Sequence, residues 1–278
     1  MRIISLKTDL DQVISEYRKS GKRIGFVPTM GALHQGHVSL VEASRKQADV
    51  TVCSIFVNPT QFNDKNDLLR YPRTPEQDIL MLEQAGCDVL FMPPVEEVYP
   101  VPDTRVFDFG YLDKILDGAA RPGHFNGVGQ VVSILFSMVK PDVAFFGQKD
   151  YQQVMIIREL VRQLNLPVEI VPCPILREPD GLAMSSRNTL LSAEERKVAA
   201  HVPEFMQKAA QIYHEQDIDQ ARSYIQEAVS SQALMRLDYY MICDRNTLRE
   251  IEHKNQPAIS LIAVFVGKIR LIDNLFLD

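Results

Sequence analysis

Short apolar runs alternate with segments of helical periodicity over the first two thirds of the chain. The runs include IGFVPT at 24–29, VTVCSIFV at 50–57 and DVAFFG at 142–147, while HVSLVEASRKQA at 37–48 and YQQVMIIRELVRQLN at 151–165 repeat apolar residues three and four positions apart. Strands that alternate with helices are typical of a parallel sheet with crossover helices. The pattern therefore predicts a Rossmann-like, doubly wound α/β domain.

Residues that start and stop helices support one of these elements. Thr74 has the character of an N-cap, Pro75 stands at the first helical position, and Gln77 has the spacing of a capping-box partner. Gly86 follows the last residue with helical periodicity, where glycine commonly ends a helix. The signals predict a helix between these limits.

The pattern changes after the loop REPDGLAMSSRNTLL. Ser192 and Glu195 form a capping box that predicts the start of a long helix, and a second helical stretch covers about 218–232. The strand-like runs that follow are LDYYMI, AISLIAVFV and IRLIDNLFL. Helices followed by strands predict a small α+β domain, so we divide the chain into a catalytic domain, residues 1–180, and a smaller lid domain, residues 181–278.

Charge and composition narrow the classes of partner. The formal net charge of −6 provides no broad basic face for a nucleic-acid backbone, so we expect no nucleic-acid partner. A small phosphorylated ligand, held by a few aimed groups, fits this charge better. The longest apolar run, PAISLIAVFVG, is too short to span a bilayer, so we expect no membrane partner either.

The cysteines and the N-terminal residues bear on the compartment. Cys53, Cys87, Cys173 and Cys243 are scattered without a C-x-x-C pair. The first dozen residues carry charges where an export signal needs an unbroken apolar region. We therefore expect a cytoplasmic protein with reduced thiols.

Two histidines lie in the stretch TMGALHQGHVSL, at the turn from a predicted strand to a predicted helix. Open α/β sheets bind ligands at the carboxyl ends of their strands, and a helix N-terminus there presents free N–H groups to an anion. Gly31 and Gly36 let the backbone approach a phosphate, and His34 and His37 add donors from the side. The turn is predicted to bind the phosphates of a nucleotide.

This turn has two other interpretations. Gly31 and Gly36 have the spacing of a P-loop, but the lysine and the hydroxyl residue that should follow are absent. The two histidines could also be ordinary surface residues of a turn, because a bare H-x-G-H motif is short. Motifs elsewhere in the chain are needed to choose among these interpretations of the turn.

Seven ordered blocks, spread over nearly the whole chain, resemble the pantothenate synthetase (pantoate-beta-alanine ligase) family of the HIGH-type nucleotidylyltransferase superfamily. The blocks are VPTMGALHQGHVSL, IFVNPTQF, YPRT, RPGHF, PDVAFFGQKDYQQ, DGLAMSSRN and RLIDN. The resemblance implies ATP-dependent condensation of pantoate with β-alanine to pantothenate through pantoyl adenylate, with release of pyrophosphate and AMP. It also implies Mg²⁺ and a homodimer.

Roles for individual residues follow from the resemblance. The residues implied to bind ATP are Met30, Gly31, Ala32, Leu33, His34, Gln35, Gly36, His37, Gly147, Gln148, Lys149, Asp150, Leu176, Met184, Ser185, Ser186 and Arg187. Those implied to be catalytic are His34, His37, Lys149, Ser185, Ser186 and Arg187. Those implied to bind pantoate or β-alanine are Asn58, Gln61 and Gln153, with Tyr71, Arg121 and His124 as further candidates.

No compact carboxylate cluster appears in the sequence, so Mg²⁺ is expected on phosphate oxygens and water. Asp78 is the one carboxylate nominated as a metal ligand. Other residues have structural alternatives: Asp150 and Gln153 have the spacing of a capping box, Gln61 could be a turn residue, and 184–187 could be a solvated linker.

One helical segment departs from the family pattern. Gln130, Ile134 and Ser137 stand where many members carry a threonine, a lysine and an asparagine. We expect this helix to serve mainly packing, but the departures leave the details of the pantoate pocket open.

Three other functions compete with the ligase. A different nucleotidylyltransferase of the same superfamily would share the two-histidine turn but would not explain IFVNPTQF or KDYQQ. An RNA-binding module that kept only the synthetase fold conflicts with the net charge. A nucleotide sensor would bind ATP without turnover.

Overall fold

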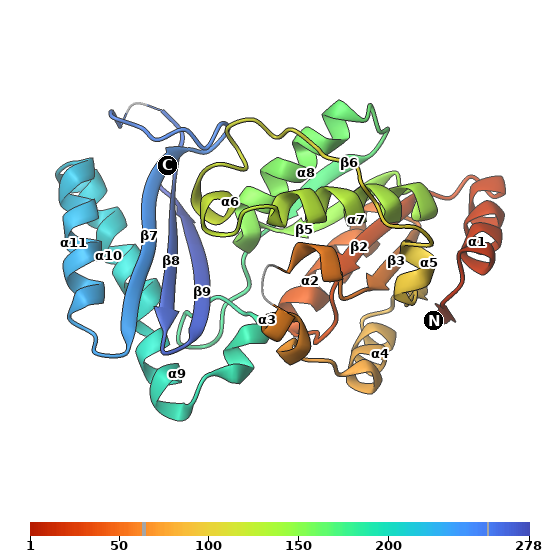
Figure 1. Ribbon diagram of the computed structural model, residues 1–278, viewed down its shortest axis with the longest axis horizontal. Helices are drawn as coiled ribbons and strands as arrows, with labels where there is room; N and C mark the ends of the chain where they lie inside the picture. Colours follow the sequence, from red (N-terminus) through yellow and green to blue (C-terminus); the bar gives the residue numbers. More distant parts are fainter. Residues whose placement is uncertain (63–64, 255) are drawn as a thin grey trace. The chain divides into compact units, whose positions relative to one another are not determined.

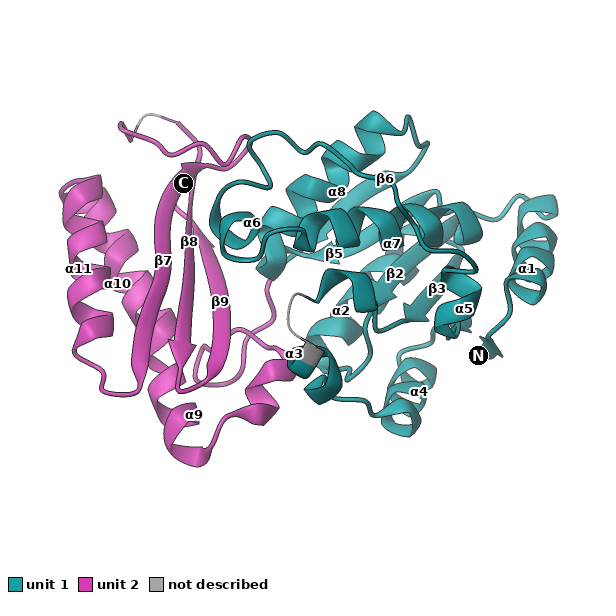
Figure 2. Ribbon diagram, in the orientation of Figure 1, with its two compact units in different colours: residues 1–174 teal, residues 175–278 magenta. Residues whose placement is uncertain are grey.

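The computed structural model describes residues 1–62, 65–254 and 256–278. The chain forms two compact units, residues 1–174 and residues 175–278, each with its own hydrophobic core (Figure 2). The sequence placed the division at residue 180, inside the loop. The structure divides just after the last strand of the first unit.

A six-stranded sheet forms the centre of the first unit, and every pair of neighbouring strands is parallel (Figure 1). Its order is β1-β4-β3-β2-β5-β6. The strands are β1 Arg2–Ile4, β2 Ile24–Thr29, β3 Val50–Ile55, β4 Val89–Phe91, β5 Val143–Gly147 and β6 Glu169–Cys173.

Helices and short turns connect these strands. The α-helices are α1 Lys7–Lys19, α2 Gln35–Gln47, α3 Lys65–Arg70, α4 Pro75–Gln84, α5 Val95–Val98, α6 Leu116–Ala120, α7 His124–Val139 and α8 Tyr151–Gln163. Two 3-10 turns, η1 Pro59–Gln61 and η2 Gln148–Asp150, follow β3 and β5.

The sheet is covered on both faces. Phe26 belongs to a cluster with residues of α1, α7 and α8, whereas its neighbour Val27 belongs to a cluster with residues of α2 and α4. Consecutive residues of a strand point to opposite faces, so the two clusters are two separate layers. The prediction of a doubly wound parallel sheet is confirmed.

The apolar pattern did not predict the first two elements, β1 and α1. A strand of three residues has too few positions to show a periodicity. In α1, Leu10, Val13 and Ile14 are buried at helical spacing, and burying each side chain stabilises the unit by about 1.5–3 kcal/mol. β1 pairs with β4, far from it in the sequence, and forms one edge of the sheet.

One predicted helix cap is wrong. Pro75 is the first residue of α4 and Gly86 follows the helix at φ +77°, as predicted. The Thr74 side chain, however, makes no cap hydrogen bond; its hydroxyl donates to Asp78 Oδ1 at 3.0 Å. The sequence could not show this competing acceptor one turn into the helix.

The second unit packs helices against a three-stranded antiparallel sheet with the order β7-β8-β9. Its elements are η3 Ser186–Leu190, α9 Ala193–Ala199, α10 His201–Glu215, α11 Ile218–Ser230, β7 Met235–Asp244, β8 Ala258–Val266 and β9 Ile269–Phe276. The predicted capping box is confirmed, because Ser192 accepts from Glu195 N–H and Glu195 accepts from Ser192 N–H. The predicted long helix is two helices, α9 and α10.

Candidate active site

The strand order brings two predicted ATP segments to one place. β2 pairs with β3 on one side and with β5 on the other, so the direction of winding reverses between β2 and β5 (Figure 1). Open α/β sheets bind ligands at the carboxyl ends of the strands at such a switch point. Residues 30–37 follow β2 and residues 147–150 lie at the end of β5, so both segments are at this edge.

His34 and His37 cap the N-terminus of α2 as a pair. Gly36 N–H donates to His34 Nδ1 at 3.1 Å, His34 N–H donates to His37 Nδ1 at 3.3 Å, and the ring centroids are 4.1 Å apart. Each ring uses Nδ1 as an acceptor, which assigns the proton of the neutral imidazole to Nε2. Two Nε2–H donors are thereby held at a helix N-terminus.

The electrostatics keep both rings neutral. Burial, followed by repulsion from Lys149, lowers the pKa of His34 to about 4. Burial, followed by repulsion from His34 and Lys149, lowers the pKa of His37 to about 3. At neutral pH the rings are uncharged hydrogen-bond donors, so the geometry favours phosphate binding by His37 over proton donation.

Asp78 on α4 holds the loop that leads into this turn. Its carboxylate, 1% exposed, accepts from Ala32 N–H at 2.9 Å and from Leu33 N–H at 2.8 Å. Gly31 and Ala32 both have left-handed backbone angles, with φ +79° and +49°, and the second costs energy because alanine carries a Cβ. The two backbone hydrogen bonds offset that cost.

These contacts give the carboxylate of Asp78, the candidate metal ligand, a structural role. Both carboxylate oxygens already accept from the protein, because Oδ1 also accepts from the Thr74 hydroxyl. Within residues 1–62, 65–254 and 256–278, no group of three or more His, Cys, Asp or Glu side chains is arranged to hold a metal ion. Asp78 is a residue that shapes the loop.

Replacing Asp78 with asparagine is expected to raise the KM for ATP by about tenfold or more, because one backbone hydrogen bond to a charged acceptor is lost and an amide N–H faces a backbone N–H. Steady-state kinetics with varied ATP measures this. Asp49→Asn is the matched control, since Asp49 also accepts a backbone N–H, from Arg23, at the other end of the strands. An unchanged KM in Asp78→Asn would contradict the role.

The GQKD segment adds a cation and open space. Lys149 Nζ lies 3.8 Å from Asp150 Oδ2, and its charge lowers the pKa of both histidines. A Cβ added to Gly147 would meet no atom within 4 Å, so space is available beside this residue. Asp150 is the N-cap residue of α8, but its side chain makes no cap hydrogen bond, so the capping-box interpretation of Asp150 and Gln153 is wrong.

Gln61 ends η1 and is held through both its side chain and its backbone. Its Oε1 accepts from Asn58 Nδ2 at 3.2 Å, and its Nε2 lies 3.0 Å from Met30 Sδ in the first ATP segment. His124 Nδ1 donates to the Gln61 carbonyl at 2.8 Å, and Arg121 lies 3.2 Å from the other ring nitrogen of His124. The RPGHF block therefore fixes the position of Gln61.

Asn58 and Gln153 differ in their surroundings. Asn58 is 1% exposed, and its amide bonds to Thr60, Gln61 and other protein groups, so the structure places it beneath Gln61. Gln153 lies half-buried in the first turn of α8. Its neighbour Gln152, which the sequence did not single out, is buried and ties α8 to residues 112–117, which include the start of α6.

The second ATP signature belongs to the second unit. Met184 N–H donates to the Leu176 carbonyl at 3.0 Å, so these two predicted ATP residues are neighbours. Ser185 caps η3 by accepting from Arg187 N–H at 3.3 Å, and Ser186 begins that turn. The segment is a built turn with a specific cap, which the linker interpretation does not predict.

A buried ion pair braces this turn. Arg177 donates to both oxygens of Asp273, at 2.7 and 3.0 Å, and to the Gly181 carbonyl at 3.0 Å. The Asp273 side chain is 2% exposed. The sequence pointed to RLIDN only as a matching block, and the fold shows that its aspartate in β9 holds the chain on which residues 176–187 are built.

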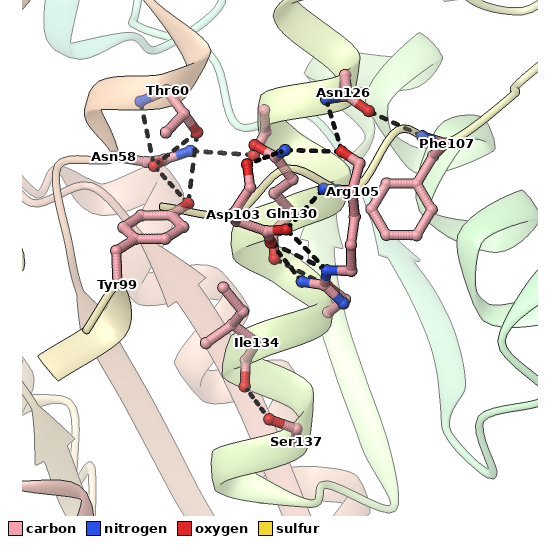
Figure 3. Close-up of polar contacts among 12 residues, drawn as sticks. Asn58, Thr60, Tyr99, Asp103, Arg105, Phe107, Asn126, Gln130, Ile134 and Ser137 are labelled. Carbon is pink, nitrogen blue, oxygen red and sulfur yellow. Dashed lines mark hydrogen bonds and ion pairs between the residues drawn. The ribbon is translucent and has the colours of Figure 1, made fainter. Parts of the chain in front are cut away.

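The helix with the family departures is α7, and most of its residues are buried. Ile134 packs against the core, and the Ser137 hydroxyl donates to the Ile134 carbonyl at 2.7 Å (Figure 3). Gln130 is different, because its buried amide donates to the carbonyls of Asp103 and Arg105. Of the three positions, Ile134 serves packing, Gln130 holds a loop, and Ser137 is exposed and bonds only within the helix.

The structure also shows the state of the cysteines and the character of the helices. The four cysteines are free and buried. Across the described parts of the chain, none of the helices combines the length and the apolar character that a membrane span requires.

The switch-point edge, with two neutral imidazoles at a helix N-terminus and a lysine beside them, is typical of a nucleotide-binding α/β protein. The particular family follows from comparison with known proteins. The family model described as pantoate-beta-alanine ligase matches residues 2–276, and the chain belongs to this family.

Known relatives agree with the family over the full length. A pantothenate synthetase of Bacteroides fragilis is 50% identical over 277 residues, covering 99% of this chain and 98% of the relative. The crystal structure of pantothenate synthetase from Thermus thermophilus is 42% identical, with a TM-score of 0.94 and coverage of 100% and 99%. That of pantoate-beta-alanine ligase from Francisella tularensis, complexed with beta-gamma ATP and beta-alanine, is 35% identical, with a TM-score of 0.82 and coverage of 100% and 98%. The family resemblance and the fold class predicted from the sequence are confirmed.

Proposed function

We propose that this protein joins (R)-pantoate to β-alanine at the expense of ATP, forming pantothenate through pantoyl adenylate. The observation that carries the proposal is the pair of neutral imidazoles at the N-terminus of α2, with Lys149 close enough to act on both. This is an anion site with aimed donors, in a chain of the pantoate-beta-alanine ligase family. The relative from Francisella tularensis, complexed with beta-gamma ATP and beta-alanine, supports two of the three substrates.

In the first step a carboxylate oxygen of pantoate attacks the α-phosphorus of ATP, and the bond from that phosphorus to the bridging oxygen breaks. Pyrophosphate leaves with the electron pair. Negative charge grows on phosphate oxygens, so fixed donors and a cation stabilise the transition state. We assign this work to His34, His37 and Lys149.

In the second step the amine of β-alanine attacks the carbonyl carbon of pantoyl adenylate, the bond to the phosphate oxygen breaks, and AMP leaves. The nitrogen loses a proton as the amide forms. Gln61 and Gln153 are proposed to bind pantoate, since a neutral amide can donate and accept without the cost of a buried charge.

The second unit is proposed to contribute Leu176 to adenine binding and Met184, Ser185, Ser186 and Arg187 to the ATP phosphates. The planar guanidinium of arginine suits phosphate oxygens. The lid role of this unit remains a prediction.

Mg²⁺ is proposed to enter as part of the nucleotide complex, neutralising the triphosphate. Both oxygens of Asp78 already accept hydrogen bonds from the protein, so we propose that the metal is held by phosphate oxygens and water. A homodimer and a cytoplasmic location are likewise proposed on the strength of the family.

AMP release from ATP and Mg²⁺ tests the proposed function directly. The purified protein is given pantoate alone, β-alanine alone, or both, and AMP, pyrophosphate and pantothenate are measured. Rapid AMP release with matching pantothenate is expected only with both substrates. If pantoate stimulates neither pyrophosphate nor AMP release, the ligase assignment fails.

The same assay separates the competing functions. Pyrophosphate release that depends on a different acceptor, with a stable nucleotide-linked product, would indicate another nucleotidylyltransferase. ATP binding without turnover in any mixture would indicate a sensor. Filter binding of RNA at low salt tests the RNA-binding module, for which no retention is expected from a chain of net charge −6.

A further inference from the structure

A segment that we call the strap, residues 99–107, runs from Tyr99, beside Asn58, along α7 (Figure 3). Gln130 Nε2 donates to the carbonyls of Asp103 at 3.0 Å and Arg105 at 2.8 Å. Further along, Phe107 N–H donates to Asn126 Oδ1 at 2.9 Å. The strap is therefore fixed to α7 by backbone hydrogen bonds to two side chains of the helix.

Tyr99, at the start of the strap, completes the bonding of Asn58. Its hydroxyl donates to Asn58 Oδ1 at 2.9 Å, and Thr60 donates to the same oxygen from its N–H and its hydroxyl, at 3.4 and 3.1 Å. On the other side, Asn58 Nδ2 donates to Gln61 Oε1 at 3.2 Å and to the Gly127 carbonyl at 3.1 Å. Three donors meet the oxygen and two acceptors meet the nitrogen, so only one orientation of this buried amide satisfies its partners.

The orientation of Asn58 decides that of Gln61. Because Asn58 presents N–H to Gln61 Oε1, the Gln61 amide turns its Nε2 toward the first ATP segment, where it lies 3.0 Å from Met30 Sδ. Exchanging the nitrogen and oxygen of Gln61 would place two N–H groups against each other. One of the two N–H groups on Nε2 faces Met30 Sδ, and Gln61 is thus set to offer the other, which suits a carboxylate or hydroxyl oxygen of an acid substrate.

We infer that Tyr99 is a positioning residue for pantoate: its hydroxyl holds Asn58, and through Asn58 the Gln61 amide, in the orientation that donates to a substrate oxygen. The inference rests on the proposed function. Burial raises the pKa of the Tyr99 phenol, so the hydroxyl keeps its proton at neutral pH. The strap, fixed by Gln130, holds the tyrosine in place.

The test is a comparison of Tyr99→Phe with the wild type. The substitution removes the neutral hydrogen bond from the Tyr99 hydroxyl to Asn58. We expect the KM for pantoate to rise about three- to tenfold, with the KM for ATP unchanged. Tyr17→Phe is the matched control, since Tyr17 on α1 packs against the same core and takes no part in the contacts just described. Its KM for pantoate should equal that of the wild type.

A double-mutant cycle distinguishes positioning from general loosening of the structure. Pantoate binding is measured by calorimetry in the presence of α,β-methylene-ATP, which works for inactive variants as well. If Tyr99 acts through Gln61, Tyr99→Phe weakens binding in the wild type but not in a Gln61→Ala background. Equal weakening in both backgrounds would overturn the inference.

These experiments distinguish a failure of the proposed function from a failure of the positioning role of Tyr99. If the wild type forms no pantothenate, the proposed function fails. If the wild type forms pantothenate and Tyr99→Phe leaves pantoate affinity unchanged, only the positioning role fails. A Gln130→Met variant, which keeps the length of the side chain but removes its donors to the strap, is expected to show a smaller loss of the same kind.

Discussion

Replacing His37 with alanine is expected to slow formation of pantoyl adenylate by about a hundred- to a thousandfold, the usual effect of removing one donor aimed at developing charge. The ring holds an Nε2–H donor at the N-terminus of α2, and its Nδ1 accepts from His34 N–H. Alanine loses both contacts. Pyrophosphate release in a single turnover, with enzyme in excess over ATP, measures the step.

His201→Ala is the matched control for this substitution. His201 lies at the start of α10, pairs with Glu204 and has a side chain 44% exposed, so its loss should leave adenylation unchanged. Thermal unfolding of both variants checks that the fold persists. An adenylation rate in His37→Ala equal to that of the wild type would remove His37 from the site.

The pH dependence separates a hydrogen-bond donor from an acid. The pKa values of about 4 for His34 and about 3 for His37 lie below the ordinary value of 6.5, so both rings are neutral above pH 5. The wild-type adenylation rate should therefore show no imidazole titration between pH 5 and 8. A titration in that range that disappears in His37→Ala would mean that the ring acts as an acid.

The same shifts bear on stability. Because the folded pKa values are depressed, the unfolded chain binds protons more readily than the folded one below about pH 6.5. Stability contributed by the neutral rings is complete above that pH and falls as the pH drops through about 4 for His34 and about 3 for His37. Protonation at Nδ1 would also break the reciprocal cap.

Replacing Asp273 with alanine is expected to lower the free energy of unfolding by about 3 kcal/mol, the lower end of the range for breaking a buried ion pair. The lower end applies because the Arg177 side chain is 29% exposed, while that of Asp273 is 2% exposed. The substitution leaves the guanidinium without its bidentate acceptor. Urea unfolding followed by circular dichroism measures the change.

Asp219→Ala in the same unit is the control, since Asp219 forms an i,i+3 pair with Arg222 and is 89% exposed. Its effect should stay within about 0.5 kcal/mol. Asp273→Ala should in addition raise the KM for ATP, because Arg177 also donates to the Gly181 carbonyl within the loop before the second signature. An Asp273→Ala variant as stable as the wild type would show that the ion pair between Arg177 and Asp273 does not stabilise this unit.

The sequence was sufficient to predict the elements that depend on residues close to one another along the chain. The run at Ile24–Thr29 has the bounds of β2 and the run at Ala258–Val266 has those of β8, because buried strands are continuous apolar stretches between turn residues. The capping box at Ser192 lies within four residues, so it was predictable too. The place of His34 and His37 in a strand-to-helix turn was predicted as well, because the turn lies between two patterns that the sequence shows.

Other features depend on partners far apart in the sequence. β1 exists because it pairs with β4, and Asp78 shapes the loop after β2 because α4 brings its carboxylate to Ala32 and Leu33. Neither residue spacing nor periodicity records such contacts.

The family and the fold class could thus be predicted from the order of residues, since each depends on neighbours along the chain, whereas the two ATP signatures stay predictions. The tertiary structure decided which carboxylate shapes the loop and which tyrosine orients the amide of Gln61. It also decided the tautomers of the two histidines. The physical reason is that hydrogen-bond direction and burial depend on atoms that only folding brings together, as with Tyr99 and Asn58, 41 positions apart.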